Sequence, residues 1–106
     1  MSFEYEIHLD NKDSLEIIKS WLKASPYYVS FEDDNNINLR DYTLNHSWSY
    51  DIRFHSNGSN IIFMVINNFS KNLFITIRDS LMGYNYQIID DDEEVSLEYI
   101  FRSCLN

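Results

Sequence analysis

The fold follows from the segment Trp48-Ser-Tyr-Asp-Ile-Arg-Phe-His55, read together with the segment Ile61-Ile-Phe-Met-Val-Ile66. In the first segment, large apolar residues occupy every second position, and Ser49, Asp51, Arg53 and His55 occupy the others. This alternation predicts a strand with one wet face. The second segment is apolar throughout, which predicts a central strand covered on both faces. Between them, Asn57-Gly58 is typical of a tight hairpin turn.

Further strands are expected on both sides of this hairpin. Apolar residues alternate with polar ones over residues 3–9, 27–31 and 37–42, and residues 84–89 are expected to form the last strand. Together with three helices, these strands predict an α+β fold in the order β-α-β-β-β-β-α-β-α. We expect one domain, residues 1–106, with a mostly antiparallel sheet of about six strands.

Each expected helix has a start signal. Asp13 precedes the first helix, with Glu16 placed to complete a capping box, and Pro26 follows its expected end near Ala24. Ser70 is expected to cap the second helix, and Gly83 stands where a left-handed C-cap belongs. The third helix is expected to open with an acidic run and to turn Leu97, Ile100, Phe101 and Cys104 inward.

Composition restricts the class of protein. The chain has 106 residues, 44% of them hydrophobic, which favours a folded domain over a disordered one. The single cysteine, Cys104, cannot form an intrachain disulfide, and the N-terminus lacks the pattern of a secretory signal. The longest apolar run, residues 61–66, is too short to span a bilayer. These features predict a cytoplasmic protein.

Charge is the strongest hint of function. The net charge is −9, from 17 acidic and 8 basic side chains. Such a protein repels nucleic acid and anionic lipid and attracts basic partners. The alternative is that the charge serves solubility alone.

The densest acidic cluster is a run of five consecutive carboxylates: Asp90, Asp91, Asp92, Glu93 and Glu94. Acidic residues suit the first turn of a helix because they interact favourably with its dipole. We expect these residues to cap a helix. They either stabilise the helix alone or also contact a basic partner. The run lacks the alternating ligands and the glycine of a Ca²⁺ loop.

A second acidic group is Glu32, Asp33 and Asp34, in an expected hairpin turn. A turn needs polar residues in any case, but this one could also enter a cationic cleft. Asp41 and Asp51, on neighbouring expected strands, could extend the same negative surface. These residues and Asp90 to Glu94 are the candidate partner-binding residues.

Nothing in the sequence indicates catalysis, a cofactor or a metal site. His8, His46 and His55 are far apart, and none lies at metal-binding spacing. Cys104 is expected in the core. If the chain were an enzyme, Asp51, His55 and His8 would be the groups to nominate.

In size, acidity and α+β layout, with the acidic stretches 32–34 and 90–94, the whole chain resembles the immunity proteins of bacterial polymorphic toxin systems, including contact-dependent growth inhibition. The resemblance implies a cytoplasmic, non-enzymatic antitoxin. Its partner would be a basic toxin domain, most plausibly an RNase or DNase, and we expect a monomer. The alternatives are a secretion chaperone or adaptor for an effector, a small enzyme, and a DNA mimic.

Overall fold

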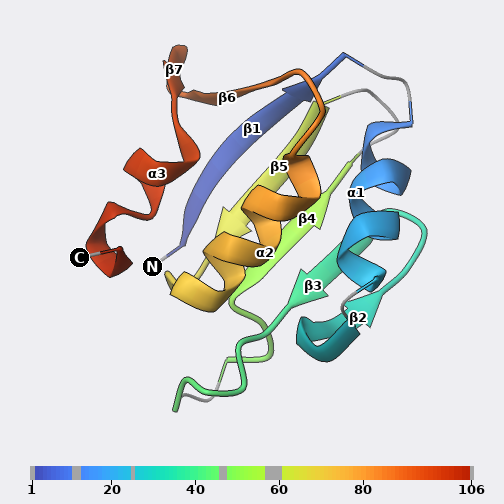
Figure 1. Ribbon diagram of the computed structural model, residues 1–106, viewed down its shortest axis with the longest axis vertical. Coiled ribbons are helices and arrows are strands. Elements are labelled where there is room, and N and C mark those ends of the chain that lie inside the picture. Colours follow the sequence, from blue (N-terminus) through green and yellow to red (C-terminus); the bar gives the residue numbers. More distant parts are fainter. Residues whose placement is uncertain (1, 11–12, 25, 46–47, 57–60, 106) are drawn as a thin grey trace.

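The structure, a computed structural model, describes residues 2–10, 13–24, 26–45, 48–56 and 61–105 (Figure 1). These residues form an α+β fold, as predicted, with one antiparallel sheet and three α-helices. In chain order the elements are β1 (Phe3–Leu9), α1 (Ser14–Lys23), the 3₁₀ turn η1 (Pro26–Tyr28), β2 (Val29–Glu32), β3 (Asn36–Leu39), β4 (Ile52–His55), β5 (Ile61–Ile66), α2 (Lys71–Leu81), β6 (Tyr86–Asp90), β7 (Glu93–Val95), α3 (Leu97–Ile100) and the 3₁₀ turn η2 (Arg102–Cys104).

The strand order is β2-β3-β4-β5-β1-β6-β7, so the N-terminal strand lies inside the sheet, between β5 and β6. Every neighbouring pair is antiparallel. As predicted, β5 is central. The register pairs Ile7 of β1 with Ile62 on one side and with Ile88 on the other. These three side chains are buried together and form the middle of the core.

The helices cover one face of the sheet. Figure 1 shows α1 and α2 in front of the strands. The rings of Phe74 in α2 and Phe101 after α3 lie 5.5 Å apart, which places the C-terminal segment on the same side. On β5, Ile62, Met64 and Ile66 are buried, whereas the residues between them are only half-buried. The prediction that β5 is covered on both faces is therefore wrong for the described part of the chain.

Helix starts agree in part with the predictions. Ser70 caps α2, and its hydroxyl accepts a hydrogen bond from the Leu73 N–H at 3.1 Å. Gly83, just after this helix, has φ +91, a value that glycine adopts without strain. Asp13 occupies the N-cap of α1, but its side chain makes no capping hydrogen bond. The expected capping box is therefore absent.

Four strands are shorter than predicted, among them β6, which begins at Tyr86 rather than at residue 84. β2 begins at Val29 because residues 26–28 form a 3₁₀ turn, and β3 ends at Leu39. β4 begins only at Ile52, although its alternation is as expected, with Ile52 and Phe54 buried. The expected turn at Asn57-Gly58 lies outside the described residues, as does His46.

The acidic run does not open a helix, and that prediction is wrong. Asp90 ends β6 and pairs with Glu93 of β7, which leaves a two-residue turn made by Asp91 and Asp92. Both turn residues have positive φ, 54 and 68, as such hairpin turns require. The last helix begins later and is capped by Ser96. The sheet therefore has seven strands rather than about six in the described part of the chain.

Within the described residues, no helix is long and apolar enough to cross a membrane.

The turn at Asp91 yields a testable prediction. Asn tolerates positive φ, whereas a β-branched side chain does not, so Asp91→Val should unfold about 1–2 kcal/mol more easily than Asp91→Asn. Both variants remove the same charge, so the difference between their free energies of unfolding reports the effect of the backbone conformation at residue 91. Urea unfolding of the two variants at one pH measures it, and equal midpoints with equal slopes would contradict the turn described here.

Candidate functional site: an acidic hairpin

The β6–β7 hairpin carries the densest exposed charge of the protein. All five carboxylates from Asp90 to Glu94 are exposed. None of the ion pairs among the described residues involves them. Because Asp90 and Glu93 are cross-strand partners, two like charges stand opposite each other, an arrangement that weakens a hairpin. The hairpin therefore presents negative charge that the described part of the protein does not neutralise.

Two further carboxylates extend this surface along the sheet. The register pairs Glu6 of β1 with Ile89, and Ile89 with Glu94, so the three form one row across the strands. Glu4 is exposed two positions before Glu6 and points to the same face. His8, two positions after it, has its Nε2 3.3 Å from the Glu6 carboxylate. We call Glu4, Glu6 and Asp90 to Glu94 the acidic surface.

Arg102, whose charge acts on Tyr5 together with that of Asp90, is already engaged. Arg102 donates a hydrogen bond to the Tyr99 carbonyl at 2.6 Å, and its guanidinium lies 4.0 Å from the centre of the Tyr99 ring. Burial raises the pKa of Tyr5. The charge of Asp90 raises this pKa further, and the charge of Arg102 lowers it in part. Arg102 thus lies close enough to Tyr5 to influence its pKa, but among the described residues it forms no ion pair with the hairpin.

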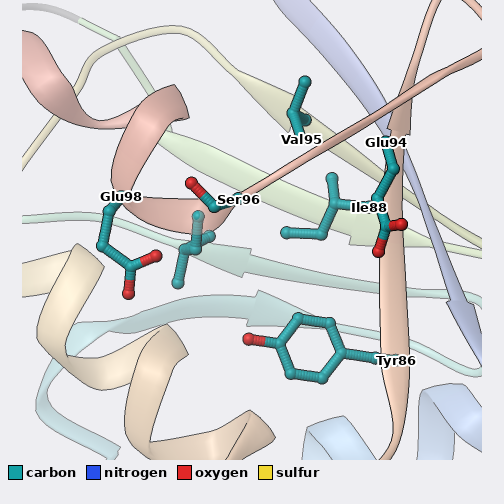
Figure 2. A pocket seen from close by; sticks show the side chains of 7 residues that line it. Tyr86, Ile88, Glu94, Val95, Ser96 and Glu98 are labelled. Carbon is teal, nitrogen blue, oxygen red and sulfur yellow. The ribbon is translucent and has the colours of Figure 1, made fainter.

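A pocket opens beside the hairpin, between β6, β7 and the start of α3 (Figure 2). Its volume is about 400 Å³, and its lining comprises Tyr86, Ile88, Glu94, Val95, Ser96, Leu97 and Glu98. Figure 2 shows the carboxylates of Glu94 and Glu98 on opposite sides of the pocket, with the Tyr86 ring pointing into it. Burial, and then the charge of Glu98, raises the pKa of Tyr86. The pocket therefore combines an apolar floor with an acidic rim.

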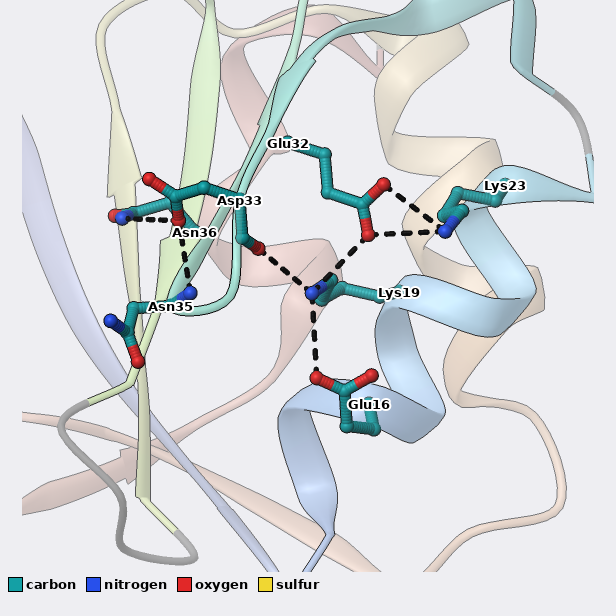
Figure 3. A network of polar contacts seen from close by, with 7 residues as sticks. All are labelled: Glu16, Lys19, Lys23, Glu32, Asp33, Asn35 and Asn36. Atoms are coloured by element: carbon teal, nitrogen blue, oxygen red, sulfur yellow. Dashed lines mark hydrogen bonds and ion pairs between the residues drawn. The ribbon is translucent and has the colours of Figure 1, made fainter.

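The second predicted cluster is structural rather than free. Glu32 forms ion pairs with Lys19 at 3.2 Å and Lys23 at 3.1 Å, which join β2 to α1 (Figure 3). The nearly buried Lys19 also lies 3.4 Å from Glu16 and donates a hydrogen bond to the Asp33 carbonyl at 2.8 Å. Glu32 therefore holds a helix onto the sheet, and the prediction that it contacts a partner loses its basis.

The pKa values in this network follow from its contacts. The hydrogen bond from Lys23 lowers the pKa of Glu32 more than burial raises it, and Lys19 adds to the lowering. Burial lowers the pKa of Lys19, but hydrogen bonds to Glu32 and Glu16 more than offset that effect, so its net pKa is raised. Each partner thus favours the charged form of the other.

The other two residues of this turn differ from each other. Asp33 Oδ1 accepts hydrogen bonds from the Asn35 N–H at 2.9 Å and from Asn36 Nδ2 at 3.0 Å, and these bonds lower the pKa of Asp33. Such a carboxylate shapes the turn. Asp34 is exposed and makes no ion pair with the described residues. Within the described part of the chain, Asp34 is therefore the carboxylate of this turn that is not engaged, whereas the exposed Asp33 already has a structural role.

Asp41 is buried, and its predicted place on a negative surface is wrong. Its carboxylate accepts hydrogen bonds from Thr43 Oγ1 at 2.6 Å, from Asn72 Nδ2 at 3.2 Å and from the Ser70 hydroxyl. Ser70 in turn caps α2, so Asp41 ties the loop after β3 to the start of that helix. Burial raises the pKa of Asp41, but the hydrogen bonds from Ser70 and Thr43 outweigh burial and lower it overall.

Asp51 is fully buried as well, contrary to the prediction that it lies on the wet face with His55. Its Oδ2 accepts a hydrogen bond from the Asp41 N–H at 2.7 Å, and its Oδ1 accepts one from Asn68 Nδ2 at 3.1 Å. The Asp51 carbonyl also accepts one from the Asn67 N–H at 2.7 Å. Asp51 thus joins the loop before β4 to the loop after β5.

The structure separates the predicted site residues into two kinds. It brings Asp90 to Glu94 together on one exposed hairpin and leaves Asp34 exposed in a separate turn, whereas Glu32, Asp33, Asp41 and Asp51 stabilise the fold. Sequence reasoning missed Glu4, Glu6 and Glu98 as part of the acidic region. The first two alternate with apolar residues in β1, so their wet face was visible, but their position beside β6 depends on the strand order.

Catalytic or metal chemistry gains no support from the described residues. His55 stacks on Phe63, with ring centroids 5.2 Å apart, and His8 lies beside Glu6. Burial raises the pKa of the Cys104 thiol, which disfavours the reactive thiolate. No group of three or more potential metal ligands occurs among the described residues.

Comparison of the chain with protein-family models, with curated proteins and with solved structures gave no match.

The buried Asp41 predicts how stability depends on pH. Because its pKa is lower in the folded than in the unfolded protein, Asp41 contributes stability above the unfolded value of about 3.9 and loses that contribution as the pH falls through the folded value. Asp41→Asn removes acceptors for buried donors and should cost about 2 kcal/mol at pH 7. It should also flatten the loss of stability in acid.

The matched control is Asp34→Asn, which makes the same chemical change at an exposed position. Urea unfolding at several pH values between 3 and 7 compares the variants. Equal stability of the two at pH 7, or an unchanged acid profile for Asp41→Asn, would refute the stabilising role of Asp41.

Proposed function

We propose that the chain is a cytoplasmic immunity protein that binds a basic toxin domain and neutralises it by protein–protein contact, without catalysis, cofactor or metal. The observation that supports this proposal best is the β6–β7 hairpin, whose five exposed carboxylates form no ion pair within the described residues. A toxin that cleaves RNA or DNA needs a cationic cleft for phosphates. An exposed row of carboxylates is complementary to such a cleft.

The shape of the hairpin suits this role. A two-residue turn with positive φ at Asp91 and Asp92 holds the acidic tip in one conformation, so little entropy is lost when a partner binds. Complementary charge accelerates association and excludes acidic competitors. The charge therefore supplies speed and selectivity, while apolar contacts nearby supply much of the affinity.

The interface must extend beyond the hairpin tip. A specific interface covers roughly 800 Å² on each partner, about an eighth of this protein's 6334 Å² surface. Glu4 and Glu6 enlarge the acidic surface along β1, and half-buried Ile89 and Phe63 supply apolar area on the same face. We infer that the contact spreads from the hairpin onto this face of the sheet, which no helix covers within the described residues.

One observation favours the alternative of a chaperone or adaptor for an effector. Trp21 in α1 and Ile75 in α2 are 51% and 38% exposed and line a pocket between the two helices, and Met82 is 67% exposed. An exposed apolar helix face was not expected from the sequence, and it suits an apolar client segment. The net charge and the acidic hairpin still favour a basic, folded partner. We therefore prefer the immunity protein to the chaperone.

The experiment is co-expression with the C-terminal domain of the protein that the adjacent upstream gene encodes, scored by cell survival and by recovery of a complex. The unmodified chain should rescue growth and copurify with the toxin domain. Rescue failure together with absence of a complex would refute the immunity proposal. Binding of an unfolded effector segment instead would favour the chaperone.

A charge-reversal pair tests which surface makes contact. Glu93→Lys with Glu94→Lys should slow association about tenfold or more at low salt and weaken rescue, because electrostatic steering is lost. The matched control, Asp34→Lys with Asp79→Lys, makes the same change in net charge at exposed sites away from the hairpin. Stopped-flow association rates over a range of salt concentrations compare the pairs. Equal slowing by both would contradict a special role of the hairpin, because overall charge or the exposed Asp34 would then contribute as much.

A further inference from the structure

The pocket between β6, β7 and α3 has the chemistry of a site for one cationic side chain. Its floor is made of Ile88, Leu97 and the ring of Tyr86, and the carboxylates of Glu94 and Glu98 stand at its rim. Ile88 and Leu97 are buried, whereas Glu94 and Glu98 are exposed. Apolar depth with charge confined to the rim matches a side chain that has an apolar stem and a charged end.

Both rim carboxylates are available. Neither Glu94 nor Glu98 forms an ion pair with the described residues. The neighbouring Ser96 hydroxyl, by contrast, is used, because it accepts a hydrogen bond from the Tyr99 N–H and caps α3. A ligand that enters the pocket would therefore meet two unpaired acceptors and one aromatic ring.

We propose that this pocket binds an arginine side chain, which, given the proposed function, is an anchor residue of the basic partner. A guanidinium is planar, so it stacks on an aromatic ring and presents several donors to carboxylates at once. The ammonium of lysine is a compact point charge, which can lie over a ring but has neither a planar face to stack on it nor a fixed fork of donors. The Tyr86 ring beside the two carboxylates is therefore the reason to prefer arginine.

The size of the pocket agrees with this occupant. About 400 Å³ lies near the lower end of the range for ligand pockets, too small for a folded segment and sufficient for one long side chain. Its position also fits, because Glu94 belongs both to the rim and to the hairpin. An arginine seated here would place the backbone of the partner beside the β6–β7 hairpin. The pocket would then fix the register of a partner that charge attracts from a distance.

The test uses the full chain and needs no toxin. N-acetyl-L-arginine amide is titrated into the ¹⁵N-labelled protein, and chemical shifts are followed by NMR. The expected result is a saturable shift of amides in residues 86–98, with affinity about fivefold weaker for the neutral isostere N-acetyl-L-citrulline amide, as loss of an exposed ion pair allows. N-acetyl-L-lysine amide should also bind more weakly than the arginine amide.

The variant arm is Glu94→Gln with Glu98→Gln, which should abolish the preference for arginine over citrulline. Glu93→Gln is the matched control, since Glu93 is exposed on the same strand but does not line the pocket. Tyr86→Leu should weaken the arginine amide while an unchanged amide spectrum elsewhere shows that the fold is intact.

Three results would overturn the assignment: no saturable shift in residues 86–98, equal affinity for the arginine and citrulline amides, or equal affinity for the lysine amide. This test is separate from the survival assay. If the arginine amide binds but the chain does not rescue growth, the arginine site stands and the immunity role is refuted. If the chain rescues growth but the amide does not bind, only the assignment of the arginine site is refuted.

Discussion

The position of β1 between β5 and β6 is the constraint on which the rest of the structure depends. Its alternation puts Ile7 and Leu9 into the core and Glu4, Glu6 and His8 on the opposite face. Because β6 pairs with β1 on one side and with β7 on the other, the sheet joins the β6–β7 hairpin to the body of the protein through the N-terminal strand. The same pairing sets Glu6 beside Ile89 and so joins the acidic hairpin to the face of β1.

Several cations of the described part of the chain are engaged internally. Lys19 and Lys23 bind Glu32, Arg78 lies 3.4 Å from Asp79, and Arg102 stacks on Tyr99. The buried carboxylates of Asp41 and Asp51 are satisfied by hydrogen bonds from hydroxyl, amide and backbone groups instead. With 17 acidic residues and only 8 basic ones, the remaining negative charge must stay exposed, and it gathers at the β6–β7 hairpin.

Sequence patterns predicted what depends on local periodicity. The alternation in β1 and in Ile52–His55, the cap at Ser70 and the α+β order were all visible, because each rests on residues close together in the chain. Burial of Asp51 was not visible. In the alternation of apolar and polar residues, Asp51 occupies a position expected to face solvent. Its partners, Asp41 and Asn68, come from other parts of the sequence.

The acidic run shows a second limit of sequence reasoning. Carboxylates before an apolar segment suit both the first turn of a helix and a hairpin at a sheet edge. Pairing decided between them, because Val95 lies opposite Ile88 and continues the sheet, and Ser96 then caps the helix. The ion pairs of Glu32 were equally hidden, since they require α1 to pack beside β2.

The most direct test of the account is backbone hydrogen exchange of the chain, alone and in complex with the basic toxin domain that we propose as its partner. The account predicts slower exchange in the complex over residues 86–98, together with residues 4–6, and unchanged exchange in residues 40–45. Protection confined to the exposed aromatic residues Tyr27, Tyr42 and Trp48, with the hairpin unchanged, would contradict it.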